Sequence, residues 1–403
     1  MCRPIRWFGS IALIASVACQ PSRVAAPHKP PTDTSSTQPF PSYEMIDLGS
    51  LGSPVEIDSL GRVYAYISDS AGQRILRWDR GTITEVGIPG GFPSLSRSGL
   101  FGAGSVCPHE SETCTLFFLH DGTVAPLETG DPVYAQESAI RFVGDDGSVI
   151  GAVQERSHAN WQTGTAALWR HGARHDLEAI DSLHPLIAAR MINAAGQVIG
   201  VSYDTSFRHS VPYLWQNGVA RDLGSLFDQS CAAQPDTSCG GTALWINSRG
   251  DIVGWSVSPT GLERAVIWRD GGAVQDLGLF PGQSTFVEYI DDQGDMYGFA
   301  GSNKWWAIVG GVQYDPGAPA GVPSHPERMN QRGEIVGYVG DAGTPGLHPH
   351  AFVWRKGKML DLGVGPAGSQ SADALHINDR GDVLGVYLNA QGQPGIVLWR
   401  VSN

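Results

Sequence analysis

The feature that most constrains the fold is a short pattern that the chain repeats. It reads HAFVWRKGKMLDLG from His350 to Gly363, and related versions are VPYLWQNGVARDLG, AVIWRDGGAVQDLG and TAALWRHGARHDLE. Each version is an apolar run that usually ends in Trp, then a polar turn with Gly, then a run that ends in Asp-Leu. A catalytic motif occurs once, whereas a recurring pattern is typical of repeated structural units.

A second motif accompanies the first, with the versions INAAGQVIG, INSRGDIVG, IDDQGDMYG, MNQRGEIVG and INDRGDVLG. Weaker copies begin at Ile57, Leu95 and Val143. The glycine shared by the eight copies is Gly61, Gly99, Gly147, Gly196, Gly250, Gly294, Gly333 and Gly381. The spacing of 38 to 54 residues between these glycines predicts propeller blades or solenoid turns.

The apolar run also has eight copies. They end at Trp78, Leu119, Trp169, Trp215, Trp268, Val309, Trp354 and Trp399. Together the motifs resemble the HAF repeats of a bacterial extracellular repeat family, named for the tripeptide His350-Ala351-Phe352. The resemblance covers nearly everything from Tyr43 onward, although Leu119 and Val309 depart from the pattern. It implies an exported repeat protein and carries no established activity.

Each copy predicts four short strands, named A to D in chain order. The A strand ends at the Ile-Asn position, B carries Val-Ile-Gly, C is the Trp run and D ends in Asp-Leu-Gly. Asx-x-x-Gly joins A to B, and Arg-Asp-Gly or Gln-Asn-Gly joins C to D, as hairpin turns. Four antiparallel strands per repeat favour a propeller over a solenoid.

The two ends of the repeat region complement each other. The stretch from Glu44 to Gly49 is a D strand without a blade, and the final GIVLWRVSN is a C strand without a D. Pairing them completes an eighth blade and removes two exposed sheet edges. An open solenoid needs polar capping repeats, which neither end resembles. The expected fold is an all-β propeller of eight four-stranded blades over residues 43–403, closed by this pairing.

Repeated residues receive structural interpretations. The Trp of each C strand is expected to pack between blades rather than stack on a ligand. The Asn or Asp at positions 58, 193, 247, 291, 330 and 378 is expected to bond its own turn backbone. The tripeptides beginning at Arg249 and Arg380 resemble adhesion motifs but fill the same turn. Calcium stays an alternative for Asp291 to Asp295, although the EF-hand spacing is missing.

The N-terminal residues 1–18 are typical of a secretory leader, with Arg3 and Arg6 before the apolar run from Trp7 to Val17. The leader resembles a bacterial lipoprotein signal, which implies lipid on Cys19; simple cleavage after Ala18 is the alternative. Residues 19–42 are rich in Pro, Ser and Thr and are expected to form a tether. The expected location is the cell envelope or the extracellular space, with membrane contact only through the lipid.

The other cysteines favour disulfides. Without the leader, five cysteines remain, an odd number that lipid on Cys19 resolves. The remaining four form two local pairs, Cys107 with Cys114 and Cys231 with Cys239, each in a polar loop. Because a CxxC pattern is absent, no metal and no cofactor is expected.

Charge and motifs exclude several functions. The net charge of −13 repels nucleic acid and anionic lipid. No Gly-rich phosphate loop opens a helix, and no Ser nucleophile elbow is present. The loop histidines His109, His158, His348 and His350 are expected to be exposed rather than to share a metal.

The residues just before the Ile-Asn position are expected to line the central channel. They are Glu56, Arg141, Arg190, Glu288, Glu327, Arg328 and His376. Two of them, Glu288 and Glu327, could form an acid and base pair if their environments separate their pKa values. The favoured interpretation is a solvated channel in which Glu and Arg neutralise each other.

The two faces of such a propeller differ. The A–B and C–D turns are short and repetitive and form a tight-turn face, while the long irregular B–C and D–A connections form a variable-loop face. The D strand begins at the tight-turn face, so a lipid on Cys19 would turn the variable loops away from the membrane. The leading hypothesis is a monomeric, non-enzymatic scaffold that binds a protein or glycan through the variable-loop face. The alternatives are a secreted polysaccharide hydrolase or lyase that uses the channel carboxylates, and a structural spacer.

Overall fold

The structure is a computed structural model. The described residues are 39–402, apart from 70–71, 87–93, 107–112, 121–122, 129–132, 135–138, 154–164, 228–238, 302–303, 317–321 and 341–347. The predicted leader, Cys19 and all but the last residues of the predicted tether lie outside this part.

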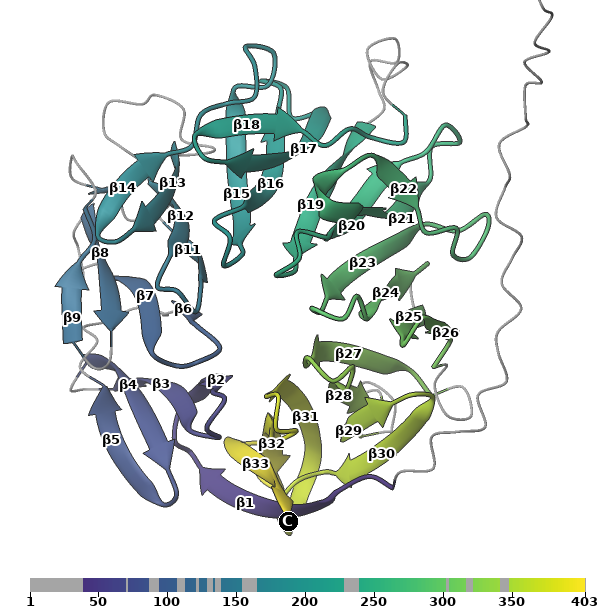
Figure 1. Ribbon diagram of the computed structural model, residues 1–403. Helices are drawn as coiled ribbons and strands as arrows, with labels where there is room; N and C mark the ends of the chain where they lie inside the picture. The colour runs from purple at the N-terminus through teal and green to yellow at the C-terminus, as the bar shows by residue number, and fades with distance from the viewer. Residues whose placement is uncertain are drawn as a thin grey trace, which may run out of the picture. The chain divides into compact units, whose positions relative to one another are not determined.

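The described unit is all-β, as predicted, and consists of antiparallel sheets with one short 3-10 turn, η2 (Arg269–Gly271). Figure 1 shows the sheets in chain order around a common centre, with the first strand of most sheets at the inner edge. Within the described residues, no helix has the length and apolar character that a membrane span requires.

The strands follow the sequence repeats. The first four repeats contain β2 (Ser53–Ile57), β3 (Val63–Asp69), β4 (Gly72–Asp79), β5 (Thr82–Val86); β6 (Ser94–Leu95), β7 (Phe101–Val106), β8 (Thr113–His120), β9 (Thr123–Pro126), β10 (Val133–Tyr134); β11 (Ala139–Val143), β12 (Val149–Val153), β13 (Thr165–Arg170), β14 (Ala173–Asp176); β15 (Leu186–Ile192), β16 (Val198–Tyr203), β17 (His209–Gln216) and β18 (Val219–Asp222). The last four contain β19 (Cys239–Ile246), β20 (Ile252–Val257), β21 (Glu263–Trp268), β22 (Val274–Asp276); β23 (Thr285–Ile290), β24 (Met296–Ala300), β25 (Lys304–Val309), β26 (Val312–Tyr314); β27 (Ser324–Met329), β28 (Ile335–Val339), β29 (His350–Arg355), β30 (Lys358–Gly363); β31 (Ser369–Ile377), β32 (Val383–Asn389), β33 (Pro394–Ser402), and β1 (Ser42–Gly49) joins this last sheet.

Two sheets depart from a simple four-stranded meander. The short strand β10 adds a fifth member to the β6–β9 sheet by pairing with β8. The β15–β18 and β19–β22 meanders join into one sheet through a two-residue parallel bridge, in which His209 lies opposite Cys239. Both additions come from the irregular connections, which the repeat pattern does not describe.

The two ends of the unit pair as the sequence predicted. Strand β1 lies antiparallel to β33, with Met45 opposite Trp399 and Gly49 opposite Ile396. The apolar residues of this sheet also pack against the β2–β5 sheet, where Leu384 and Leu398 contact a cluster that contains Trp78. The first and last repeats are therefore neighbours in space (Figure 1).

The C-strand tryptophans pack between sheets, as predicted. Trp268 is fully buried and contacts Ile199 and Leu214 of the preceding sheet. Trp169 and Trp354 are buried in the same manner against the sheets that precede theirs. Full burial of a side chain of this size removes the largest apolar surface that any residue offers. It leaves no free indole face for a ligand at these positions.

The glycine of each Val-Ile-Gly segment is required by a close backbone approach. A Cβ atom on Gly254 of β20 would lie 2.0 Å from the carbonyl oxygen of Thr242 in β19. Equivalent clashes of about the same size occur at Gly200, Gly298, Gly337 and Gly385. Any side chain here would push the A and B strands apart, which explains why the motif retains Gly.

The A–B turns are held by their first residue. The Asn247 side-chain oxygen accepts the backbone N–H groups of Arg249 at 3.0 Å and Asp251 at 2.9 Å. The same two bonds occur at positions 58, 193, 291, 330 and 378. The prediction that these residues bond their own turn is confirmed.

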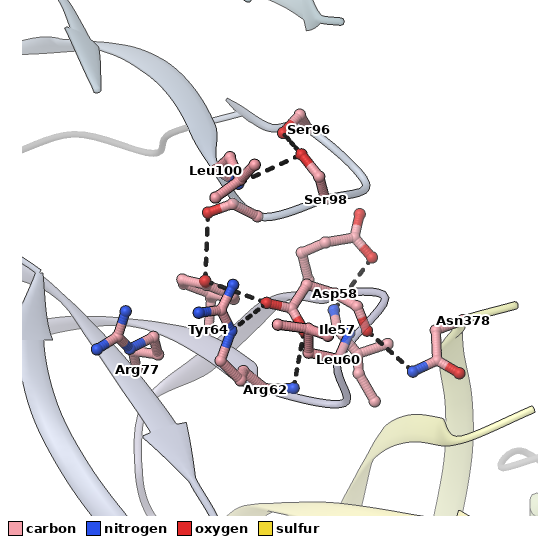
Figure 2. Close-up of polar contacts among 12 residues, drawn as sticks. Ile57, Asp58, Leu60, Arg62, Tyr64, Arg77, Ser96, Ser98, Leu100 and Asn378 are labelled. Carbon is pink, nitrogen blue, oxygen red and sulfur yellow. Dashed lines mark hydrogen bonds and ion pairs between the residues drawn. The ribbon is translucent and has the colours of Figure 1, made fainter. Parts of the chain in front are cut away.

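The amide nitrogen of the same residue makes a link that the sequence analysis missed. Asn193 Nδ2 donates to the backbone oxygen of Asn247 at 3.0 Å, and Asn247 Nδ2 donates to that of Asp291 at 2.9 Å. In the same way Asn330 Nδ2 donates to Asn378 O at 3.0 Å, and Asn378 Nδ2 to Asp58 O at 2.9 Å. Figure 2 shows the last of these bonds, which joins the last sheet to the first. The turns therefore hold neighbouring sheets together.

The series of links predicts an effect of Asp291→Asn. Asp291 is fully buried, and burial, opposed by backbone hydrogen bonds, raises its pKa to about 6. The folded state therefore binds this proton more tightly than the unfolded state, and stability falls as pH rises from about 4 to 6. An asparagine at position 291 would not ionise, so this loss of stability would not occur. It would also supply the side-chain amide that donates to the next turn in other repeats. We expect Asp291→Asn to stabilise the protein by about 1 kcal/mol at pH 8 and less at pH 5, measured by urea unfolding.

The matched control is Asn247→Asp, which places a carboxylate where the neighbouring carbonyl needs a donor. We expect it to destabilise the protein by about 2 kcal/mol at pH 8. If Asp291→Asn and Asn247→Asp shift stability in the same direction at pH 8, the inter-sheet role of the turn amide is wrong.

Candidate functional site

The A strands share an irregularity at the positions where the sequence predicted channel residues. In seven of the A strands the register skips one residue near the strand end, which is a β-bulge. The skipped residues are Val55, Arg141, Arg190, Leu244, Glu288, Glu327 and Leu375. Four of the seven predicted channel residues are thus bulge residues. The other three, Glu56, Arg328 and His376, directly follow a bulge.

The three residues that follow a bulge come together. Glu56 Oε2 lies 3.2 Å from Arg328 Nη2, and Glu56 Oε1 lies 3.3 Å from His376 Nδ1. His376 Nδ1 is also 2.7 Å from Arg328 Nη1. Although burial alone would raise the pKa of Glu56, the partners Arg328 and His376 lower it to about 2. This network joins three A strands from three sheets and keeps Glu56 ionised.

A second contact crosses the centre, and the sequence analysis missed it. An Arg97 guanidinium nitrogen donates to the Tyr289 hydroxyl, which also accepts from Gln331 Nε2 at 3.2 Å. The Trp245 ring lies 4.7 Å from the Tyr289 ring. Tyr289 and Trp245 follow bulges, so alignment of the repeats at that position could have identified them. The pockets near these residues have volumes of only about 250 and 150 Å³.

The two carboxylates predicted as an acid and base pair are coupled to other groups. Burial raises the pKa of Glu288, and Arg190 and His325 oppose that rise. The Glu327 carboxylate lies 3.2 Å from His325 Nδ1, and its charge acts on Asp373. The carboxyl group that the structure couples to Glu327 is therefore Asp373, which the sequence analysis did not single out.

A pocket with a volume of about 830 Å³ lies on the variable-loop face. Its lining comes from three consecutive sheets and includes Phe299, Lys304, His325, Tyr338, Asp373 and Tyr387. These residues belong to the starts of A and C strands and to the ends of B strands, which meet at this face. The pocket therefore opens where the sequence predicted recognition.

Stacked rings form one wall of this pocket. The His325 ring lies between Phe299, 5.2 Å away, and Tyr338, 5.6 Å away and nearly parallel. Such ring faces bind apolar groups and also attract cations. The wall is therefore suited to an apolar group or to a cation.

Asp373 lines the same pocket and has an unsatisfied acceptor atom. Its Oδ1 atom is buried and has no hydrogen-bond partner among the described residues. Burial, with a further contribution from Glu327, raises the pKa of Asp373 to about 7. A buried oxygen without a partner costs free energy that a bound donor would recover. This atom is the strongest indication of a ligand in the pocket.

The remaining predicted residues give less information. Cys239 begins β19 and is buried, and Cys114 belongs to β8, while Cys107 and Cys231 lie outside the described residues. Both disulfide pairings stay predictions. His109 and His158 also lie outside the described part, and His350 Nδ1 is 2.9 Å from an Asp361 oxygen. The described residues contain no group of three or more His, Cys, Asp or Glu side chains that could hold a metal.

No protein-family model and no curated protein matches the chain. Solved structures with a similar fold include dipeptidyl peptidase 4 of Porphyromonas gingivalis, with a TM-score of 0.51 and 11% identity over 83% of this chain and 57% of that one. A prolyl endopeptidase structure has a TM-score of 0.50 and 12% identity over 88% and 54%. The β-propeller domain of the trilobed protease from Pyrococcus furiosus has a TM-score of 0.43 and 8% identity over 90% and 97%.

These similarities concern the fold. The chain spans just over half the length of the dipeptidyl peptidase and of the prolyl endopeptidase. With the antiparallel sheets around a centre, the likeness supports a β-propeller fold for residues 43–402. It says nothing about peptidase activity in this chain.

The raised pKa of Asp373 predicts a stability effect. Because the folded state holds this proton to about pH 7, wild-type stability falls as pH rises from about 4 to 7. At pH 8 we expect Asp373→Asn to be more stable than the wild type by about 1 kcal/mol; this free energy allows for screening by solvent, because Asp373 is partly exposed. At pH 4 we expect the two proteins to have similar stability. Urea unfolding at the two pH values measures the difference. A wild type that is more stable than the variant at pH 8 would contradict this assignment.

Proposed function

We propose that the protein is an exported, lipid-anchored propeller of eight blades that acts as a binding scaffold. Its ligand is a protein or a glycan, and it binds in the pocket lined by Phe299, His325, Tyr338, Asp373 and Tyr387 on the variable-loop face. The observation that carries the proposal is this roomy aromatic pocket with one unsatisfied buried carboxyl oxygen.

The repeats support the proposed number of blades. Eight A–B turns are present in the sequence, and the eight-stranded sheet consists of two four-stranded meanders joined by a two-residue bridge. The β1–β33 pairing supplies the fourth strand of the last blade. These pairings support a ring of eight blades closed by the chain ends.

The position of the N-terminal strand supports the proposed orientation. Ser42, the first residue of β1, lies opposite Ser402, the last residue of β33, at the tight-turn face. Just before it, the Pro39 oxygen accepts a hydrogen bond of 2.8 Å from Arg355. The tether thus joins the domain at the face opposite the pocket. A lipid on Cys19 would leave the pocket accessible from outside.

The central residues support binding over catalysis. Glu56 is held ionised between Arg328 and His376, and the pockets near it are small. An acid and base pair needs room for a substrate between its members. The enzyme alternative therefore depends on Glu288 and Glu327 alone.

The binding proposal is tested with residues 19–403 carrying Cys19→Ser to prevent lipidation. The protein is screened against glycan and peptide arrays, and the affinity of each hit is measured for Tyr338→Ala. The matched control is Tyr203→Ala, because Tyr203 ends β16 at the same face in a distant sheet. We expect at least about tenfold weaker binding for Tyr338→Ala and unchanged binding for Tyr203→Ala. Hits that bind all three proteins equally would refute the pocket as the binding site.

The enzyme alternative has its own test. We expect no turnover of a polysaccharide panel by the wild type. Turnover that disappears in both Glu288→Ala and Glu327→Ala, with the unfolding midpoint unchanged, would replace the scaffold proposal with a hydrolase or lyase.

A further inference from the structure

We propose that the pocket on the variable-loop face recognises an ammonium group on an apolar stem, the chemistry of a lysine side chain in a peptide, with Asp373 as its anionic partner. This inference rests on the proposed function, since it specifies the ligand of the same pocket.

The shape of the site fits such a group. The lining is mostly apolar, and the rings of Phe299, His325 and Tyr338 contact one another along one wall, where aromatic rings attract a cation. The methylene stem of lysine packs on apolar surface while its charged end seeks an acceptor. Asp373 lines the pocket, and its buried Oδ1 atom lacks a partner among the described residues.

The charges around Asp373 favour a cation over a neutral donor. Glu327 is the carboxylate that acts on Asp373, and two neighbouring carboxyl groups resist simultaneous ionisation. A sugar hydroxyl could satisfy Oδ1 but would not offset this repulsion. An ammonium group does both, because it donates a hydrogen bond and brings a positive charge.

Among the described residues, the cations beside the pocket do not fill this role. His325 Nδ1 lies 3.2 Å from a Glu327 carboxylate oxygen, and its ring contacts those of Phe299 and Tyr338. Lys304 begins β25 at the pocket and is exposed. The influences that raise the pKa of Asp373 are its burial and Glu327. The ionised form of Asp373 therefore has no cationic partner among the described residues.

The protonation of Asp373 makes the proposal measurable through pH. Its pKa of about 7 means that much of the carboxyl is neutral below neutrality. An ammonium ligand favours the ionised form, so binding releases a proton from Asp373. Lysine stays charged over this range because its usual pKa is about 10.4. Affinity should therefore rise from pH 5.5 to pH 8. The other ionisable side chains beside Asp373 are Glu327 and His325.

The test uses residues 19–403 with Cys19→Ser and four matched peptides, measured by calorimetry in two buffers of different ionisation enthalpy. The peptides carry lysine, Nε-acetyl-lysine, norleucine or arginine at the centre of the sequence Gly-Gly-Xaa-Gly-Gly with blocked ends. We expect the lysine peptide to bind at least about tenfold more tightly than the acetylated and norleucine peptides. We also expect proton release on binding at pH 6.5.

Variants separate Asp373 from its neighbours. Asp373→Asn should weaken lysine binding about tenfold at pH 8 and remove the proton release. The matched control is Glu263→Gln, because Glu263 starts β21 at the same face and does not line the pocket. It should bind like the wild type. Unchanged lysine binding and proton release in Asp373→Asn would overturn the inference.

The peptide series also distinguishes this inference from the broader proposal. If norleucine, acetyl-lysine or a neutral oligosaccharide binds as tightly as lysine and loses affinity in Tyr338→Ala, the pocket is a binding site but the ammonium inference is wrong. The ammonium inference is also wrong if the lysine peptide does not bind at millimolar concentration. Binding that survives Tyr338→Ala refutes both.

Discussion

The hydrogen bond from a turn amide to the next sheet is the interaction on which the arrangement of sheets depends. Apolar packing between sheets is strong but non-directional, so it tolerates sliding of one sheet over another. The amide of Asn247 adds a direction, because it holds its own turn through the side-chain oxygen and the next turn through the nitrogen. The hydrogen bond from the Asn378 amide to the Asp58 backbone oxygen is of the same kind and joins residues 320 positions apart. Where Asp58 replaces Asn, its carboxylate bonds Arg62 and Tyr64 instead (Figure 2).

Much of the fold could be predicted because each repeated residue answers a local need. Gly254 allows the neighbouring strand to approach closely, and Asn247 accepts hydrogen bonds from its own turn. Trp268 fills the apolar space against the adjacent strands. Such needs recur in every copy, so one sequence displays them several times. The pairing of β1 with β33 could be predicted for a related reason: each end lacked the strand that the other supplied.

The site could be predicted only in part, because it depends on features that do not repeat. A bulge near the end of the A strand moves Glu288 and Glu327 out of the register that an unbroken strand would give them, and the sequence does not reveal a one-residue bulge. The contact between Arg97 and Tyr289 joins residues 192 positions apart and has no local signature. Strand β10 arises from an irregular connection for which no repeat offers a comparison.

The position of Asp373 suggests how such sites can be found in repeat proteins. The backbone oxygen of Asp373 faces Gly385, and the equivalent oxygen in the preceding repeat belongs to His325 and faces Gly337. Earlier repeats place Phe286, Thr242 and Ala188 there, so the fold fixes the backbone at this position and leaves the side chain free. Two consecutive repeats place ionisable groups at it, and both line the large pocket. A position whose backbone is invariant and whose side chain varies costs the fold little, and it is where a repeat protein can acquire a ligand site.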